Sequence, residues 1–245
     1  MRIAVISDIH GNLPALEAVV ADIGRRGVDQ IVCLGDNLSG PLMPRETAQY
    51  LMAASWVILA GNHERQILSF CEGVSGPSDA YAHSQLSDAE FAWIRSLPAT
   101  VQLTPDIFLC HGTPDSDCEY LLESIHGDSL AVASETEVLR RLGTVQSRVV
   151  ACGHSHLHRS LRIRTGQLLV NPGSVGLQAY SDDHPHPYFV ENGTPDAFYA
   201  VIEPRSNVWS CTHHAVPYDF APMANLAAER GRPDWEQALR CGYVR

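Results

Sequence analysis

The sequence lacks a basic cluster, a long apolar run and any pair of cysteines with the Cys-x-x-Cys spacing. Acidic residues outnumber basic residues by 28 to 17, and the formal net charge is -11, so most of the surface should repel a polyanion. Extended nucleic-acid binding is therefore not expected. No apolar run approaches the roughly 20 residues that span a bilayer, and the first run is too short for a signal peptide. We expect neither secretion nor a membrane anchor.

The seven cysteines form no paired motif, and three of them (Cys33, Cys110 and Cys152) lie inside apolar runs. A cysteine in such a run usually behaves as a small buried hydrophobic residue. This usage is typical of a reducing compartment, and we expect a cytoplasmic protein.

The length of 245 residues and the hydrophobic share of 45% favour one α/β domain that spans residues 1–245. Apolar runs and helical patterns alternate as β-α-β-α-β near the N-terminus, which predicts a largely parallel sheet. Shorter alternating runs after Val149 predict antiparallel strands. Two segments with turn-forming residues, 71–86 and 178–194, predict irregular loops, the first a candidate substrate lid, and residues 217–245 predict a helical tail.

Three helix starts can be predicted from capping residues. Asn12 precedes a helical pattern and can cap it. Ser87 and Ser134 are each followed three residues later by a glutamate, Glu90 and Glu137, which is the spacing of a capping box. We expect a helix to begin at each of these positions.

Five apolar runs end in side chains that are common metal ligands. The donors, in the order of the runs, are Asp8 with His10, Asp36, Asn62, His111, and His154 with His156. Alternate residues of an extended segment share a face, so His154 and His156 should point the same way. Carboxylate, amide and imidazole donors suit divalent ions such as Mn, Fe and Zn. Seven donors are sufficient for two metals, and the carboxylate of Asp36 has two oxygens with which to bridge them.

A family resemblance follows from these motifs. Asp8-x-His10, Gly35-Asp36, Gly61-Asn62-His63-Glu64, His111 and Gly153-His154-Ser155-His156 resemble the five ordered motifs of the calcineurin-like metallophosphoesterases. Through Asn171-Pro172-Gly173-Ser174, a turn expected to fix the site rather than to catalyse, the chain is also similar to the small bacterial and archaeal branch that includes the YfcE-type phosphodiesterases. The resemblance implies a four-layer α/β/β/α sandwich of two mixed sheets flanked by helices.

The resemblance also implies a metal-dependent reaction. Two divalent ions would bind, manganese first and Fe, Zn, Ni or Co as alternatives; Asp8, His10, Asp36 and His156 would hold one ion, and Asp36, Asn62, His111 and His154 the other. A hydroxide that bridges the metals would attack a small phosphodiester or phosphomonoester, with His63 as general acid or phosphate contact. The alternative substrates are a serine/threonine phosphoprotein and a dinucleoside polyphosphate. The alternative function is a non-catalytic scaffold of the same fold that binds a partner protein.

One motif departs from that of the serine/threonine protein phosphatases, Gly-Asp-x-Val-Asp-Arg-Gly. Ser39 stands where an aspartate would orient the catalytic histidine, and Gly40 stands where an arginine would grip phosphate. These two differences argue against a protein-phosphatase function. We expect Asn12, Asn62 and Arg65 to supply the substrate contacts instead.

Overall fold

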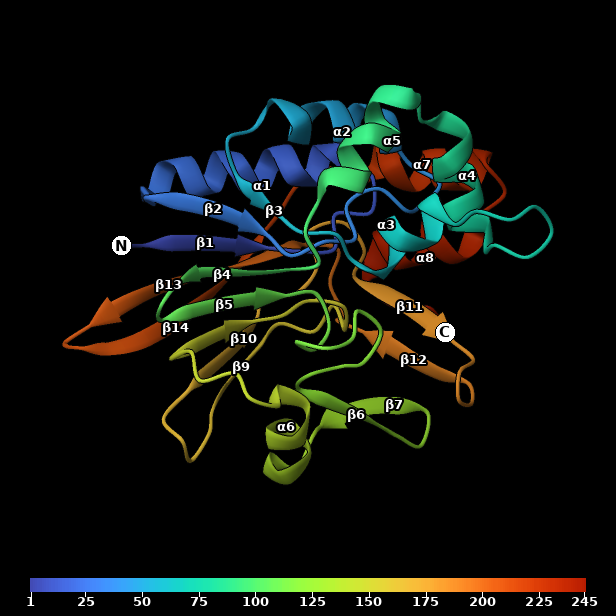
Figure 1. The fold of residues 1–245 in the computed structure, drawn as a ribbon. Helices are drawn as coiled ribbons and strands as arrows, with labels where there is room; N and C mark the ends of the chain where they lie inside the picture. Colours follow the sequence, from blue (N-terminus) through green and yellow to red (C-terminus); the bar gives the residue numbers. More distant parts are fainter.

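The chain forms two facing five-stranded sheets, and the computed structural model describes residues 1–245 (Figure 1). The first sheet has the order β14-β13-β1-β2-β3, with strands β1 (Ile3–Ile6), β2 (Gln30–Cys33), β3 (Val57–Ile58), β13 (Ala197–Arg205) and β14 (Val208–Val216). The second sheet has the order β4-β5-β8-β10-β9, with strands β4 (Thr100–Thr104), β5 (Ile107–Cys110), β8 (Val149–Ala151), β9 (Arg159–Arg162) and β10 (Leu168–Asn171).

Both large sheets are mixed, with parallel and antiparallel strand pairs. Strands β1, β2 and β3 run parallel to one another, and so do β5, β8 and β10. The other four strands, β13, β14, β4 and β9, pair antiparallel with their neighbours. Because parallel strands end at the same edge of a sheet, the side chains that follow β1, β2 and β3, and those that follow β5 and β8, are gathered at the carboxyl edges.

Eight helices and a smaller sheet complete the fold. The helices are α1 (Leu13–Arg26), α2 (Pro44–Ala53), α3 (Asn62–Leu68), α4 (Pro77–Gln85), α5 (Asp88–Ser96), α6 (Glu135–Leu142), α7 (Ala221–Glu229) and α8 (Pro233–Cys241). The smaller sheet has the order β11-β12-β7-β6, with strands β6 (Glu123–His126), β7 (Ser129–Val132), β11 (Ala179–Asp182) and β12 (Tyr188–Glu191). No helix combines the length and the apolarity that a membrane crossing requires.

The alternation of side chains along β1 divides the interior into layers. Ile3 and Val5 belong to the core between the two large sheets, and Ala4 and Ile6 belong to the core beneath α1. Helices α1 and α2 lie over the first sheet, and α6 packs on the far face of the second (Figure 1). The α/β/β/α sandwich predicted from the sequence is thereby confirmed.

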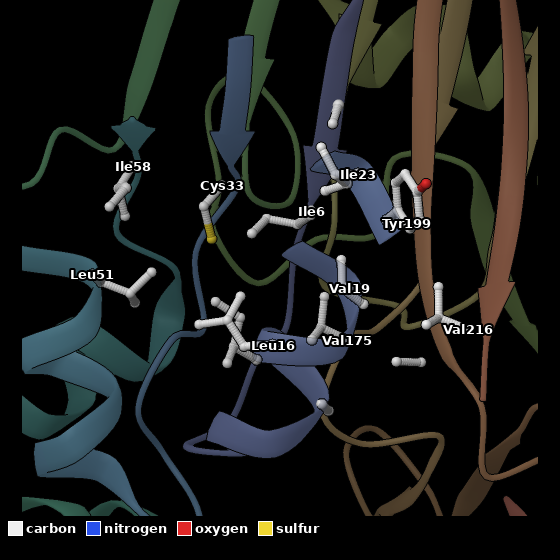
Figure 2. Packing of buried hydrophobic residues seen from close by; sticks show 14 of the residues in the cluster. Ile6, Leu16, Val19, Ile23, Cys33, Leu51, Ile58, Val175, Tyr199 and Val216 are labelled. Carbon is white, nitrogen blue, oxygen red and sulfur yellow. The ribbon is translucent and has the colours of Figure 1, made fainter. Parts of the chain in front are cut away.

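Helix α1 is held to the first sheet by its apolar face. Leu16, Val19 and Ile23 project from it towards β1 and β13 in Figure 2, and each is at most 2% exposed. Burial of one such side chain contributes roughly 1.5–3 kcal/mol, so this face fixes the helix and the turn that precedes it. The helix begins as predicted, with Asn12 Oδ1 accepting a hydrogen bond from the backbone N–H of Ala15 at 3.3 Å.

The capping boxes also form as predicted. The backbone N–H of Ser87 donates to Glu90 Oε2 at 2.8 Å at the start of α5, and that of Ser134 donates to Glu137 Oε2 at 3.0 Å at the start of α6. Local spacing is sufficient for these starts because both partners lie within one helical turn.

The prediction of irregular loops at 71–86 and 178–194 is wrong in part. Residues 77–85 form α4, which begins at Pro77. Ala82 is the only apolar residue that this helix buries, so its sequence shows no repeating apolar pattern that would predict a helix. Residues 179–191 contain β11 and β12, which pair with each other as an antiparallel hairpin, and Phe189 of β12 also pairs with Ser129 of the distant strand β7. The tail predicted to be helical contains α7 and α8.

Candidate metal centre

The predicted metal ligands meet where β1, β2, β5 and β8 end. Asp8 follows β1, Asp36 follows β2, His111 follows β5, and His154 follows β8. The backbone joins these ends, because Asp8 N donates to Gly35 O at 3.0 Å and Gly153 N donates to His111 O at 2.6 Å. The carboxyl edges of both large sheets therefore contribute to one site.

Five of the candidate ligands have a left-handed backbone. The φ angles are 57° for Asp8, 52° for His10, 53° for Asp36, 68° for His154 and 59° for His156. Such angles are strained for residues other than glycine, and strain of this kind gathers at functional sites. The surrounding fold must therefore stabilise this unfavourable backbone conformation at each of the five residues.

The first donor cluster contains Asp8, His10 and His156. The Nδ1 atom of His10 lies 2.9 Å from Ser39 O, and that of His156 lies 2.7 Å from Leu177 O. Donation from each Nδ1 to a carbonyl leaves the Nε2 lone pairs facing the site. These two Nε2 atoms are 3.1 Å apart, and His156 Nε2 is 3.5 Å from Asp8 Oδ1, a buried oxygen without a hydrogen-bond donor.

The second cluster contains Asp36, His111 and His154. His111 Nδ1 lies 3.0 Å from Leu34 O, and its Nε2 lies 3.1 Å from Asp36 Oδ2 and 3.2 Å from Asn62 Oδ1. His154 has the opposite orientation, because its Nε2 lies 3.1 Å from a backbone carbonyl, that of Cys118, and its Nδ1 is left for the site. Asn62, the remaining predicted ligand, is thus beside this second group.

The chemistry of the donor set fits two divalent cations. Burial raises the pKa of Asp8 to about 7 and lowers the pKa of His10 and of His154 to about 4, so burial favours the uncharged forms. Burial alone would also raise the pKa of Asp36, but His111 and His63 hold it well below its usual range. The Nε2 lone pairs of His10 and His156 and the unpartnered Oδ1 of Asp8 face the same point, where a bound cation would supply their missing partner.

His63 lies beside both clusters in the same cavity. Its backbone N–H donates to Asp36 Oδ1 at 3.0 Å, and its ring Nδ1 lies 2.8 Å from Asp79 Oδ1, on α4. Burial lowers the pKa of His63, but Asp36 and Asp79 outweigh that effect and raise the pKa to about 9. The contact of Nδ1 with Asp79 leaves Nε2 for a ligand in the cavity.

Glu64 supports the second cluster from below, a role that the sequence analysis did not assign. Its carboxylate accepts the backbone N–H groups of Gly61 at 2.8 Å, Asp36 at 2.9 Å and Asn37 at 2.8 Å. A Cβ at Gly61 would collide with Asp36 Oδ1, so residue 61 must be glycine for this approach. The position of Glu64, three residues after Gly61 as in a capping box, is the feature of the sequence that could have predicted its bond to the Gly61 N–H.

Asn12 and Arg65 do not make the contacts predicted for them. Asn12 is fully buried, and its Nδ2 donates to Gly176 O at 2.9 Å and to the Tyr218 hydroxyl at 3.0 Å. Arg65 pairs with Asp117 through Nε at 2.7 Å and Nη2 at 2.9 Å and does not line the cavity at the metal centre. Helix capping takes the first side chain and an ion pair takes the second, so neither faces a substrate.

The turn at residues 171–174 fixes the site, as expected. Ser174 Oγ donates to the backbone carbonyl of Asp8 at 2.8 Å, and Asn171 Nδ2 donates to that of Gly153 at 2.7 Å. These bonds tie the strand-end turns after β1 and β8 to β10. The turn acts through backbone position and offers no group to the cavity.

The centre opens into a cavity of about 300 Å³, which is lined by motif residues and also by residues from segments without motifs. Residues that the sequence analysis missed include Ser78, Tyr120, Tyr180, Arg232 and Trp235. The Tyr120 ring lies 4.8 Å from the His154 ring, and the Tyr180 ring lies 4.7 Å from the His156 ring, so the tyrosines back the histidines. No local pattern marks these side chains, because only packing directs them to the cavity.

The two facing sheets thus bring two clusters of oxygen and nitrogen donors together at their carboxyl edges. Residues 1–190 match the family model of the calcineurin-like phosphoesterase superfamily domain. The chain belongs to this superfamily, as the sequence motifs predicted. The match ends before β13, so β13, β14, α7 and α8 lie outside it.

Proteins of similar length share the architecture. An uncharacterised protein of Methanocaldococcus jannaschii is 26% identical over 257 residues, which cover 95% of this chain and 94% of that protein. The crystal structure of a metallophosphoesterase from Sphaerobacter thermophilus is 26% identical, with a TM-score of 0.75 and 98% of each chain covered. A hypothetical protein from Pyrococcus horikoshii has the same TM-score of 0.75 at 15% identity, over 100% of this chain and 99% of its own, which shows the shared fold.

Proposed function

We propose that this protein is a dinuclear metal-dependent phosphoesterase that hydrolyses a small phosphodiester or phosphomonoester. The observation that carries the proposal is the placement of two three-donor clusters and His63 around one cavity. A fold kept only as a protein-binding scaffold would not need a strained backbone at five of the seven candidate ligands or the buried, unpartnered oxygen of Asp8.

Asp8, His10 and His156 would hold one ion, and His111, His154 and Asn62 the other. Asp36 would contact both, because one of its oxygens faces His111 and its carboxylate is close enough to Asp8 to raise the pKa of that group. Bound metals would supply a nucleophile from water at neutral pH and neutralise charge on the phosphoryl group. Manganese suits this mixture of carboxylate and imidazole donors, as do Fe, Zn, Ni and Co.

His63 would give its Nε2 proton to the leaving oxygen, or hold a phosphoryl oxygen with it. Asp79 fixes the tautomer, since a proton on Nδ1 is held by its carboxylate. The His63 side chain is 28% exposed, which is enough for a ligand in the cavity to reach it. Asp79 thereby orients the His63 ring before substrate binds.

The cavity favours a small ester over a phosphoprotein or a dinucleoside polyphosphate. Asp182 and Asp234 line it, and Arg232 is the only arginine that does. A chain of phosphates would meet these carboxylates once its first phosphoryl group lay at the metals. A single phosphoryl group meets the metals and Arg232 without that repulsion.

Reconstitution tests the proposal. Protein stripped by a chelator and refilled with Mn should bind two metal equivalents by elemental analysis and cleave bis-p-nitrophenyl phosphate or p-nitrophenyl phosphate. Parallel samples with Fe, Zn, Ni and Co identify the preferred ion. Absence of cleavage with every ion would contradict the enzyme, and a failure to retain any metal would favour the scaffold.

We infer further that residues 1–245 act as one domain in the cytoplasm. Trp235 of α8 packs against His10, with ring centroids 5.9 Å apart, so the C-terminal segment completes a site built by the N-terminal strands. All seven cysteines are free thiols, as suits a reducing compartment. Limited proteolysis and cell fractionation test these two inferences.

A further inference from the structure

Arg232 is the one strongly basic side chain at the cavity. The chain contains 17 arginines and no lysine, and Arg232 alone among the arginines lines the cavity that holds His63 and the metal clusters. It is the residue immediately before α8 and lies outside residues 1–190, the part that matches the superfamily. Its side chain is 18% exposed, so it is largely enclosed but reachable from the cavity.

The guanidinium of Arg232 is fixed on three sides. Its Nε and Nη2 donate to the carboxylate of Asp234 at 3.0 and 2.7 Å, and its Nη1 donates to Ser78 Oγ at 2.9 Å. The Trp235 ring lies beneath it, 5.6 Å from Cζ to the ring centroid. A guanidinium has five N–H donors, so these bonds leave one N–H on each terminal nitrogen, a pair that matches two oxygens of a phosphoryl group.

Packing at Gly40 explains why this cation comes from the C-terminal segment. A Cβ at residue 40 would lie 2.5 Å from Trp235 Cη2 and 2.9 Å from His10 O, and Gly40 has a φ of +147°. No larger side chain fits there while Trp235 occupies the space. An arginine at position 40 is therefore excluded by α8, and the same helix brings Arg232 to the cavity.

We propose that Arg232 is a substrate-binding residue that contacts non-bridging oxygens of the phosphoryl group during the reaction. Asp234 and Ser78 position its guanidinium, and Trp235 supports it from below. This role deepens the proposed phosphoesterase function and rests on it. The ligand chemistry is that of a phosphate ester or of inorganic phosphate, its product.

The test compares Arg232→Gln and Arg232→Lys with the control Arg240→Gln. Arg240 lies on α8 and pairs with Glu236 at the surface, with 41% of its side chain exposed. Calorimetry measures the Kd of inorganic phosphate for the Mn-loaded protein, kinetics give KM and kcat for p-nitrophenyl phosphate esters, and elemental analysis gives the metal content.

Arg232→Gln should weaken phosphate binding and raise KM by about 10-fold or more, because charge-assisted hydrogen bonds are lost. Arg232→Lys should recover part of the loss, since it keeps the charge without the paired donors. Metal content should stay at the wild-type value, and Arg240→Gln should leave Kd, KM, kcat and metal content unchanged.

A wild-type Kd for phosphate in Arg232→Gln would overturn the proposal. If Arg232→Gln fails to fold, Arg232→Lys provides the test. A wild-type Kd for phosphate in Arg232→Lys would also contradict the proposal, because lysine cannot supply the two paired N–H donors of the guanidinium. If the wild-type protein binds phosphate but cleaves no ester, the proposed phosphoesterase function is contradicted. The comparison of Kd values still tests whether Arg232 binds phosphate.

Discussion

His63 and Asp79 face each other across 2.8 Å, from ring Nδ1 to carboxylate Oδ1, although α3 carries the first and α4 the second. Ser39 occupies the motif position at which the protein phosphatases have an aspartate for this purpose. Its carbonyl holds His10 instead, at 2.9 Å. Helix α4, in the segment predicted to be a loop, therefore restores a carboxylate to the histidine.

Asp79→Asn should slow turnover without loss of metal. The amide keeps the shape of the carboxylate but removes the negative charge that favours the protonated His63 ring, so the ring gives up its second proton more readily and less of it can act as an acid; we expect kcat to fall by about 10- to 100-fold with KM little changed. Steady-state kinetics on metal-defined protein check this. The matched control is Asp88→Asn in the exposed first turn of α5, which should be neutral. An equal loss in both variants would argue against a positioning role.

Asp36→Asn should impair both metal sites. The change keeps the shape of the side chain but removes a negative charge and one acceptor oxygen, and we expect affinity for both ions to fall by about 10- to 100-fold or more. Elemental analysis after dialysis measures the effect. His63→Asn is the contrasting variant, because it should retain two metals and mainly lower kcat. Two bound metals and full activity in Asp36→Asn would contradict the bridging role.

Asp22→Asn should lower stability in a pH-dependent manner. Burial would raise the pKa of Asp22, but hydrogen bonds from Arg26 at 2.6 Å, Tyr199 at 2.7 Å and Arg25 at 3.0 Å lower it from 3.8 to about 2. The folded carboxyl thus binds its proton less tightly than the unfolded one, so its stabilisation is complete above about pH 4 and is lost as the pH falls towards 2.

We therefore expect Asp22→Asn to lower the free energy of unfolding at pH 7 by about 1–2 kcal/mol. The decline in stability between about pH 4 and pH 2 should become shallower in the same variant. Urea unfolding at several pH values measures both effects. Glu17→Gln, an exposed change on the same helix, should leave the pH dependence as it is in the wild type.

Gly40→Ala should destabilise the packing of α8 at the site. The new methyl group would contact Trp235 and His10 O, and the φ of +147° is unfavourable for alanine, so a loss of about 1–3 kcal/mol is expected. Thermal unfolding measures the loss. Gly24→Ala in α1 is the control, because nothing lies within 4 Å of its Cβ and alanine favours a helix there. A Gly40→Ala protein as stable as the control would show that Trp235 moves aside at little cost.

The sequence by itself indicated the strands that build the site, three helix starts and the candidate metal donors. Asp8, Asp36 and His111 could be found because each directly follows an apolar run, and helix starts could be found because their partners lie within one turn. It misplaced Asn12 and Arg65 as substrate contacts, since their partners Gly176 and Asp117 are distant in the chain.

Only the tertiary structure decided what surrounds the donors. Asp79 reaches His63 through the docking of α4, and Arg232 reaches Ser78 across 154 residues through the docking of α8. Neither approach leaves a periodic or local signal, because the direction of a side chain at a helix start depends on the face that the helix buries. The donor set is thus a property of local pattern, and the groups that would act on the substrate are a property of packing.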